Sequence, residues 1–140
     1  MKKYLSFFAI ALCAIVSLTS CEEKEETDKL IGTWEWESTT TYYTNGNTYT
    51  EYASEDNWED LTFTGTLIIY DYSDKTPDDI DKLGYTFDGN YIAFLGGLVI
   101  WEVEELTNKK LVIKQESYED DFISIGEGGT DYKRTVYKRK

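Results

Sequence analysis

Apolar and polar residues alternate along the chain from Leu30 onward, in short segments separated by turn residues. In an extended strand, residues two positions apart share a face. The first segment is therefore expected to turn one face inward, which consists of Trp34, Trp36, Ser38, Thr40 and Tyr42. The Glu and Thr residues between them are expected to face water. The Asn45-Gly46-Asn47 turn then predicts a hairpin with the alternating segment 48–53.

The same alternation continues to the C-terminus. Further strands are expected at 61–63, 66–72, 85–87, 91–95, 98–106, 110–117 and 132–139. Thr76, Pro77 and the acids after them are typical of a helix start, so we expect one short helix at 77–83. Segment 54–60 is expected to form a loop or a single helical turn, and 119–129 an acidic loop. The regular spacing of about eight strands predicts an all-β fold, an antiparallel up-and-down meander that closes into a small barrel.

The first 21 residues differ in kind from the rest of the chain. Lys2 and Lys3 precede an apolar run that is short for a membrane span and has the flanks of a secretory signal peptide. Leu18-Thr19-Ser20-Cys21 resembles the lipobox of bacterial lipoproteins, in which signal peptidase II cleaves before the Cys and the thiol is acylated. We therefore expect a signal peptide at 1–20, lipidation of Cys21, and export to a membrane-anchored position. The alternative is an uncleaved anchor helix with an incidental Cys.

The charged residues after Cys21 form a separate segment. Residues 22–28 contain no apolar side chain, and such a stretch cannot bury enough surface to order itself. We predict a solvated tether over 21–29 and one barrel domain over 30–140. An acidic run directly after a lipidated Cys resembles the surface-export signal of lipoproteins in the Bacteroidetes group, and the alternative is a plain spacer. We expect the protein to be anchored in the outer membrane. The sequence does not decide whether the domain faces the outer surface or the periplasm.

Composition narrows the classes of function. The formal net charge is −13, and loss of Lys2 and Lys3 with the signal leaves 12 basic against 27 acidic residues, a net charge of −15. A phosphate backbone repels such a chain, so nucleic acid is not expected as a partner. The chain has no His, which excludes Ser-His or Cys-His catalysis and His-ligated metal sites.

The acidic residues do not indicate a metal site or an enzymatic function. The clusters at 78–81 and 119–121 lack the spacing of a calcium loop, so no metal is expected. We expect a non-enzymatic protein without a cofactor. A hydrolase that uses paired carboxylates is a remote alternative, because one carboxyl would need a pKa raised by burial.

Several motifs occur in the order found in one family. Gly32-Thr33-Trp34 opens the first strand with Gly-x-Trp, and Leu61-Thr62-Phe63 precedes a Gly-Thr pair. Trp101-Glu102-Val103-Glu104-Glu105-Leu106-Thr107 leads into Lys110-Leu111-Val112-Ile113, and Tyr132-Lys133-Arg134 follows near the end of the chain. Together they resemble the small lipocalin-like lipoproteins of Bacteroidetes over nearly all of 30–139. The resemblance implies a lipocalin-like barrel whose closed end holds Gly32 and Trp34 against an Arg of the last strand. Arg134 is the candidate, and Arg139 is the alternative because the phase of that strand is ambiguous.

The resemblance also implies that the barrel binds a small hydrophobic ligand. The candidate contacts are rings expected to point inward, namely Trp36, Phe63, Phe87, Phe94 and Trp101. Such bulky rings in a short barrel also suit a filled core.

A second hypothesis is a surface module that recognises a glycan or a protein partner through an aromatic platform. Its candidate residues lie in the Tyr-rich hairpin and just after it: Tyr42, Tyr43, Tyr49, Tyr52 and Trp58. The competing interpretation is that half of these rings cap the core and the others lie on the solvent face of strands.

The C-terminus is basic in an otherwise acidic chain. Five of the last eight residues are Lys or Arg: Lys133, Arg134, Lys138, Arg139 and Lys140. We expect them to pair with acids on neighbouring strands, or to contact anionic headgroups beneath an anchored domain.

Overall fold

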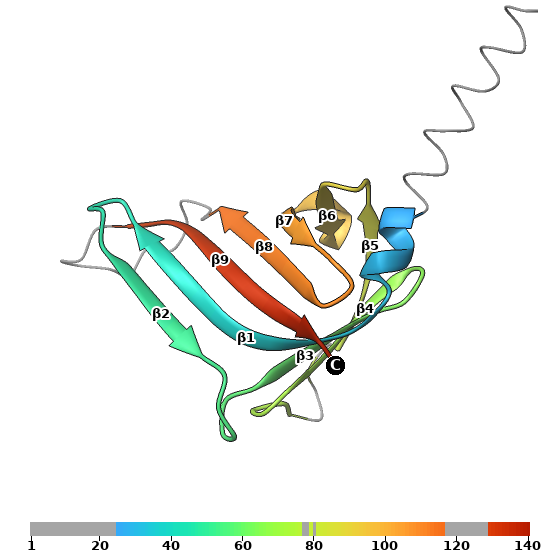
Figure 1. The fold of residues 1–140 in the computed structure, drawn as a ribbon, viewed down its shortest axis with the longest axis horizontal. Helices are drawn as coiled ribbons and strands as arrows, with labels where there is room; N and C mark the ends of the chain where they lie inside the picture. Colours follow the sequence, from blue (N-terminus) through green and yellow to red (C-terminus); the bar gives the residue numbers. More distant parts are fainter. Residues whose placement is uncertain (1–24, 77–78, 80, 117–128) are drawn as a thin grey trace, which may run out of the picture.

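The computed structural model of the protein describes residues 25–76, 79, 81–116 and 129–140. Nine strands lie within these residues: β1 (Gly32–Tyr43), β2 (Thr48–Tyr52), β3 (Glu59–Phe63), β4 (Leu67–Tyr72), β5 (Lys82–Phe87), β6 (Tyr91–Phe94), β7 (Val99–Leu106), β8 (Lys110–Glu116) and β9 (Thr130–Arg139). A 3-10 helix, η1 (Leu95–Gly97), joins β6 to β7. Residues 25–30 form a short helix before β1 (Figure 1).

The strands make one antiparallel sheet in the order β2-β1-β3-β4-β5-β6-β7-β8-β9, and β1 also pairs with β9. This pairing closes β1 and β3 to β9 into an eight-stranded barrel, consistent with a lipocalin-like fold, and leaves β2 as an extra strand. The predicted all-β meander barrel is therefore confirmed.

β1 is long enough to serve two neighbours on one edge. Its residues Gly32 to Glu35 pair with β3, whereas Ser38 to Tyr42 pair with β2. Its other edge pairs with β9 along nearly its whole length. β2 therefore continues the barrel wall beyond the end of β3, and the loop 53–58 bridges the two strands.

Apolar side chains from alternate strand positions form the core of the barrel. Six of them are at most 1% exposed: Trp34, Leu61, Phe63, Ile68, Ile92 and Leu111. Full burial of one such side chain contributes about 1.5–3 kcal/mol. This core carries the stability of a domain that has no cysteine among its described residues.

A β-bulge in β1 changes the face that its later residues occupy. Trp36 pairs with Tyr137 and Ser38 pairs with Val136, so one residue of β1 is extra at this point. Thr39, rather than Ser38, therefore lies on the same face as Trp36, and the Trp36 indole N–H donates to the Thr39 hydroxyl at 3.0 Å. The predicted inward face is correct for Trp34 and Trp36 and wrong for Ser38, Thr40 and Tyr42, because strict alternation does not allow for an inserted residue.

The helix of the structure lies in a different place from the predicted one. Lys82 and Leu83 belong to β5, so the helix predicted for 77–83 is wrong at its C-terminal end, and residues 77, 78 and 80 lie outside the described part of the chain. Residues 25–30 are helical where a solvated tether was expected. Lys29 pairs with Glu26 at 2.7 Å, and Leu30 is fully buried, so local charge pairs and one apolar anchor order this segment.

Other predictions fall on residues that the structure does not describe. These are the signal peptide at 1–20, the lipidated Cys21, and the acidic loop from 119 to 128. Within the described residues, no helix has the length and apolar character needed to cross a membrane.

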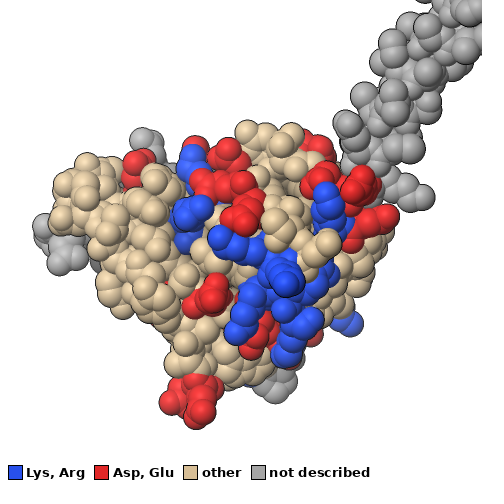
Figure 2. Space-filling view, in the orientation of Figure 1, with Lys and Arg blue, Asp and Glu red and all other residues tan. Residues whose placement is uncertain are grey.

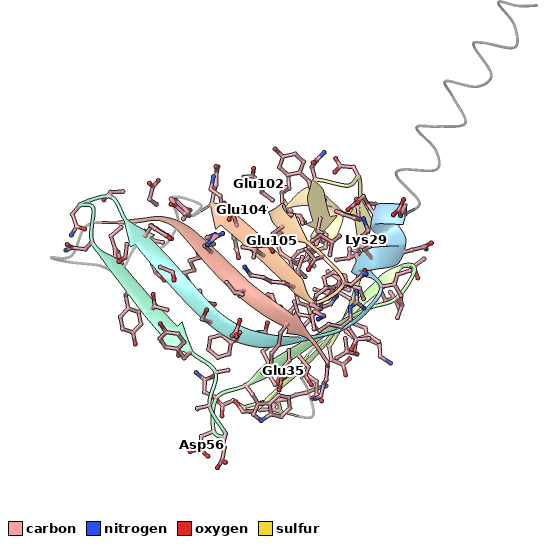
Figure 3. The ribbon with its side chains drawn as sticks, viewed as in Figure 1. Lys29, Glu35, Asp56, Glu102, Glu104 and Glu105 are labelled. Carbon is pink, nitrogen blue, oxygen red and sulfur yellow. The ribbon has the colours of Figure 1, made fainter. Side chains whose placement is uncertain are left out.

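Basic side chains gather over the C-terminal end of β9, with acidic side chains among them (Figure 2). Lys140 pairs with Asp60 at 2.6 Å, and Lys138 pairs with Glu35 at 3.3 Å. Arg134 pairs with Glu104, which lies on β7 (Figure 3). The basic residues therefore pair with acids as expected, but only the Lys138–Glu35 pair joins adjacent strands, whereas the other two pairs reach across an intervening strand.

Candidate functional site

One end of the barrel is closed by Trp34 and Arg139. The Trp34 ring is fully buried, and its indole N–H donates to the Leu30 carbonyl at 2.8 Å. The Arg139 guanidinium lies over the ring at 4.2 Å and donates to the carbonyl groups of Lys29 and Ile31. The barrel end and the short helix are thus joined by one stacked pair and its hydrogen bonds.

The arginine of this contact differs from the primary expectation. Arg134 lies on the outside and pairs with Glu104, so its assignment to barrel closure is wrong and the alternative, Arg139, takes that position. The phase of β9 is the reason, because Arg139 shares a face with the buried Tyr137, two residues earlier, whereas Arg134 does not.

Gly32 makes the close approach of Arg139 feasible. Its φ is +137°, and a Cβ atom at this position would lie 2.3 Å from Nη1 of Arg139. The Gly of the Gly-x-Trp motif therefore has two roles. It adopts a positive φ that other residues rarely adopt, and its missing side chain leaves room for the Arg139 guanidinium.

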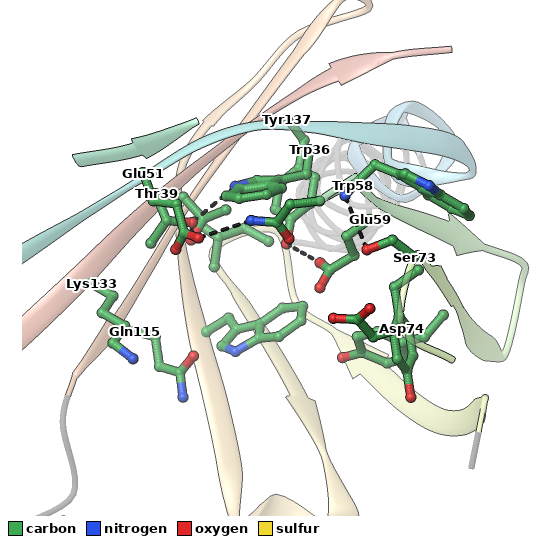
Figure 4. Close-up of a pocket in the computed structure, with 16 residues that line it drawn as sticks. Trp36, Thr39, Glu51, Trp58, Glu59, Ser73, Asp74, Gln115, Lys133 and Tyr137 are labelled. Carbon is green, nitrogen blue, oxygen red and sulfur yellow. Dashed lines mark hydrogen bonds between the residues drawn. The ribbon is translucent and has the colours of Figure 1, made fainter. Parts of the chain in front are cut away.

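Further along β1, the barrel opens into a cup with a volume of about 400 Å³ (Figure 4). Its floor consists of four buried side chains: Trp36, Trp101, Ile113 and Tyr137. Its rim carries exposed polar side chains from four elements: Glu51, Asn57, Asp74 and Lys133. The wall between floor and rim includes Trp58, Glu59, Tyr70 and Tyr72. Three of the four Trp residues of the chain therefore line this cup.

Local hydrogen bonds hold several lining groups in place. The Thr39 hydroxyl accepts from the Trp36 indole and shares a hydrogen bond with the Thr135 hydroxyl at 3.0 Å. At the rim, the Asn57 amide donates to the Glu51 carboxylate at 2.9 Å. Trp101 packs edge-on against Phe94, with ring centres 4.7 Å apart, and its buried indole N–H has no hydrogen-bond partner in the part of the chain described. The hydrogen bonds therefore fix the orientation of Trp36 on the floor and of Asn57 on the rim.

Glu59 is the acidic group that reaches deepest into the cup. It is half-buried, and Tyr137 donates its hydroxyl to Oε1 of Glu59 at 2.7 Å. Burial raises the pKa of the Glu59 carboxyl and the charge of Asp60 adds to this, whereas the hydrogen bond from Tyr137 opposes it. Burial, together with the charge of Glu59, also raises the pKa values of Tyr70 and Tyr137, so both hydroxyls stay protonated at neutral pH.

Sequence reasoning missed Glu59 because the segment 54–60 was assigned to a loop. The signal was present, however. Glu59, Leu61 and Phe63 are spaced two residues apart, and the structure places all three on the inner face of β3. An acid in phase with an apolar face indicates a buried carboxylate, whose burial has a free-energy cost unless it has a function or a partner.

The five rings predicted to contact a ligand divide into three groups. Trp36 and Trp101 line the cup. Phe63 and Phe94 are buried, but the cup lining does not include them. Phe87 packs partly against the core and borders a separate shallow groove with Tyr91 and Ile100. The structure therefore brings two of the five together at this site.

The Tyr-rich hairpin does not form one platform. Tyr42 stacks on Tyr132 with ring centres 4.3 Å apart, and Lys114 lies over the Tyr132 ring at 5.2 Å. Tyr49 and Tyr52 are 60% and 69% exposed, but their odd spacing along β2 puts them on opposite faces. Tyr43 is half-buried at the end of β1, and Trp58 belongs to the cup.

Within the described residues, no group of three or more acidic, Cys or His side chains is placed to hold a metal ion. The acid cluster at 119–121 and Asp78 lie outside those residues. Comparisons with protein-family models, curated proteins and solved structures return no match for this chain. The candidate site is therefore argued from its own geometry.

Proposed function

We propose that this protein is a non-enzymatic binding protein that holds a small molecule in the cup at the open end of its barrel. The observation that carries this proposal is the cup itself, a cavity of about 400 Å³ with a floor of aromatic rings and a polar rim. Small-molecule sites typically have about 300–1,000 Å³ and combine apolar walls with a few placed polar groups. The cavity suits a ligand of one or two rings.

The lining favours an amphipathic ligand over a purely hydrophobic one. The floor offers Trp36 and Trp101, whereas Glu59 and the rim offer charged and hydrogen-bonding groups. A purely apolar guest would bury the Glu59 carboxylate with only the Tyr137 hydrogen bond to compensate, which is costly. A guest with an apolar ring and a polar end satisfies both parts of the cup.

The N-terminal motifs extend this proposal to the position of the protein in the cell. The lipobox-like Leu18-Thr19-Ser20-Cys21 and the family resemblance support a lipoprotein anchored in the outer membrane through Cys21. Attachment through two or more acyl chains is stable, whereas a single chain is reversible. In this arrangement the domain captures ligands close to the membrane surface.

Intrinsic tryptophan fluorescence tests the binding function. The full chain is titrated with a panel of fatty acids, sugars, amines and aromatic acids, and its melting temperature is measured in parallel. We expect at least one class to change the emission and raise the melting temperature, because three of the four Trp residues line the cup. Trp58→Ala should weaken that binding, whereas Tyr52→Ala, outside the cup, should not. A panel without any response contradicts the proposal.

The exposed Tyr residues of β2 support a second candidate, a contact surface for a glycan or protein partner. Tyr52 is 69% exposed on a strand that pairs on one edge only within the described residues. Such an edge can accept a further strand. Tyr52→Lys should abolish capture of the partner in a glycan array or pull-down while leaving small-molecule binding intact. Unchanged capture would exclude this candidate.

A further inference from the structure

The charges around the cup are not balanced. Its lining contains three carboxylates, Glu51, Glu59 and Asp74, and one ammonium group, Lys133. We propose that the ligand of the cup is an organic cation, a protonated amine or quaternary ammonium group carried on a body with a ring. This inference rests on the proposed binding function and specifies the chemical class of its ligand.

Glu59 provides the first part of the argument. Its Oε1 accepts the Tyr137 hydroxyl at 2.7 Å, and its Oε2 accepts no hydrogen bond from the residues that the structure describes. A carboxylate in such partial burial is most stable beside a positive charge, because the low local dielectric strengthens their attraction. None of the ion pairs within the described residues gives Glu59 a cationic partner. A ligand cation would fill that role.

The aromatic lining provides the second part. Trp36, Trp58 and Trp101 line the same cup as Glu59. The face of an indole ring attracts a cation within about 6 Å of its centre, and Trp is the strongest of the aromatic residues in this respect. The rings also stack on the apolar body of the ligand. An ammonium group on a ring-bearing body therefore satisfies the carboxylate and the indoles together.

The rim provides the third part. Asp74 lies on the same side of the cup as Glu59, and Lys133 lies on the opposite side (Figure 4). Glu51 and Asp74 are exposed, so they create a negative potential at the entrance of the cup. The net negative charge of the chain adds to this potential. Such a potential raises the rate at which cations enter and repels anions. The same field gives no advantage to a neutral sugar.

Three probes of matched shape test the proposal: 2-phenylethylammonium, 2-phenylethanol and 3-phenylpropionate. Each is titrated into the full chain at neutral pH and low salt, and its affinity is measured by calorimetry. We expect the ammonium probe to bind at least about tenfold more tightly than the alcohol, and the carboxylate probe to bind most weakly. Added salt should reduce the advantage of the ammonium probe, because salt screens the charges at the rim.

Two variants identify the groups that are responsible. Glu59→Gln should remove most of the roughly tenfold preference for the ammonium probe. Glu37→Gln is the control, because Glu37 is an exposed acid outside the cup. Lys133→Met should strengthen binding of the ammonium probe about two- to threefold by removing the opposing charge at the rim. This second variant lies at an exposed position and keeps the test valid if Glu59→Gln does not fold.

The outcomes separate this inference from the proposed function. Equal affinities for the three probes, or a preference for the alcohol or the carboxylate, would overturn the cation assignment. Binding of sugars or fatty acids with no response to amines would also overturn it, while leaving the binding function intact. Absence of binding by every class would overturn both.

Discussion

The guanidinium carbon of Arg139 lies 4.2 Å from the centre of the Trp34 ring, and the two residues are directly opposite each other where β9 pairs with β1 at the closed end of the barrel. The side chain also donates to the carbonyl groups of Lys29 in the short helix, of Ile31 just after it, and of Asn108 between β7 and β8. Three separate parts of the chain are therefore held by one residue.

The first prediction concerns this clamp. Arg139→Met keeps the apolar stem but removes the guanidinium, and should lower the free energy of unfolding by about 2–4 kcal/mol through the lost stacking and charge-assisted hydrogen bonds. Urea denaturation measures this change. Arg134→Met is the matched control and should cost less than about 1 kcal/mol, because it breaks only a surface ion pair. Equal costs would show that Arg139 does not hold the barrel end.

A second prediction concerns the glycine beneath the guanidinium. Gly32→Ala should destabilise the domain by about 2 kcal/mol or more, because it combines a strained backbone with a clash against Arg139. Gly65→Ala, where no atom lies within 4 Å of the added Cβ, should be neutral or stabilise by about 0.5 kcal/mol. Melting temperatures of the two variants provide the comparison. A harmless Gly32→Ala would refute the close approach.

The β-bulge in β1 leads to a third prediction. Thr39→Val removes the acceptor of the Trp36 indole N–H inside the cup, and should cost about 1–2 kcal/mol. Thr40→Val removes a hydroxyl pair with Thr50 on the outer face and should cost less than about 1 kcal/mol, since water replaces the lost bond. Chemical denaturation distinguishes the two positions. If Thr40→Val were the more costly, the register of β1 beyond the bulge would be wrong.

Glu59 gives a fourth prediction, on the pH dependence of stability. Its pKa is raised in the folded state, so the folded protein binds the proton more tightly than the unfolded chain does. Stability attributable to this group is therefore greatest below the unfolded pKa of about 4.3 and is lost as the pH rises through the folded value. Glu59→Gln removes this loss, so its stability relative to the natural protein should increase with pH across that window.

Denaturation at a series of pH values tests this expectation. The difference between the two unfolding free energies isolates Glu59 from the other titrating groups. Glu37→Gln, which removes an exposed acid outside the cup, is the matched control. A pH-independent difference for Glu59→Gln would contradict the burial of its carboxylate. Such a cost in stability is common where a side chain is retained for binding.

Local sequence signals predicted most of the fold, since alternating side chains and Gly- or Asn-containing turns mark the strands directly. The errors occur where contacts between distant segments decide the outcome. The bulge between Trp36 and Ser38 depends on the register with β9 and has no signature of its own in β1. Likewise, the helix at 25–30 is ordered by the burial of Leu30 and by Arg139, more than a hundred residues later in the chain.

The candidate site was only partly predictable for the same reason. Trp36 and Trp101 were identified as inward-facing aromatic residues, and both line the cup. Glu59 and Lys133 were not identified, because a charged residue becomes part of a cavity only through strands that meet around it. Arg139 and Arg134 could not be separated until the pairing of β9 with β1 set the phase of that strand.

One edge of β1 pairs with β3 near its start and with β2 further along, and this arrangement affects how the protein can evolve. β2 and the loop 53–58 supply Glu51, Asn57 and Trp58 to the cup, yet the ring of eight strands closes without them. If the cup binds a ligand as proposed, mutations in β2 and the loop 53–58 should change its specificity with little effect on folding. Selection for a new ligand would act first on these residues, while the Trp34–Arg139 end is held constant by its role in stability.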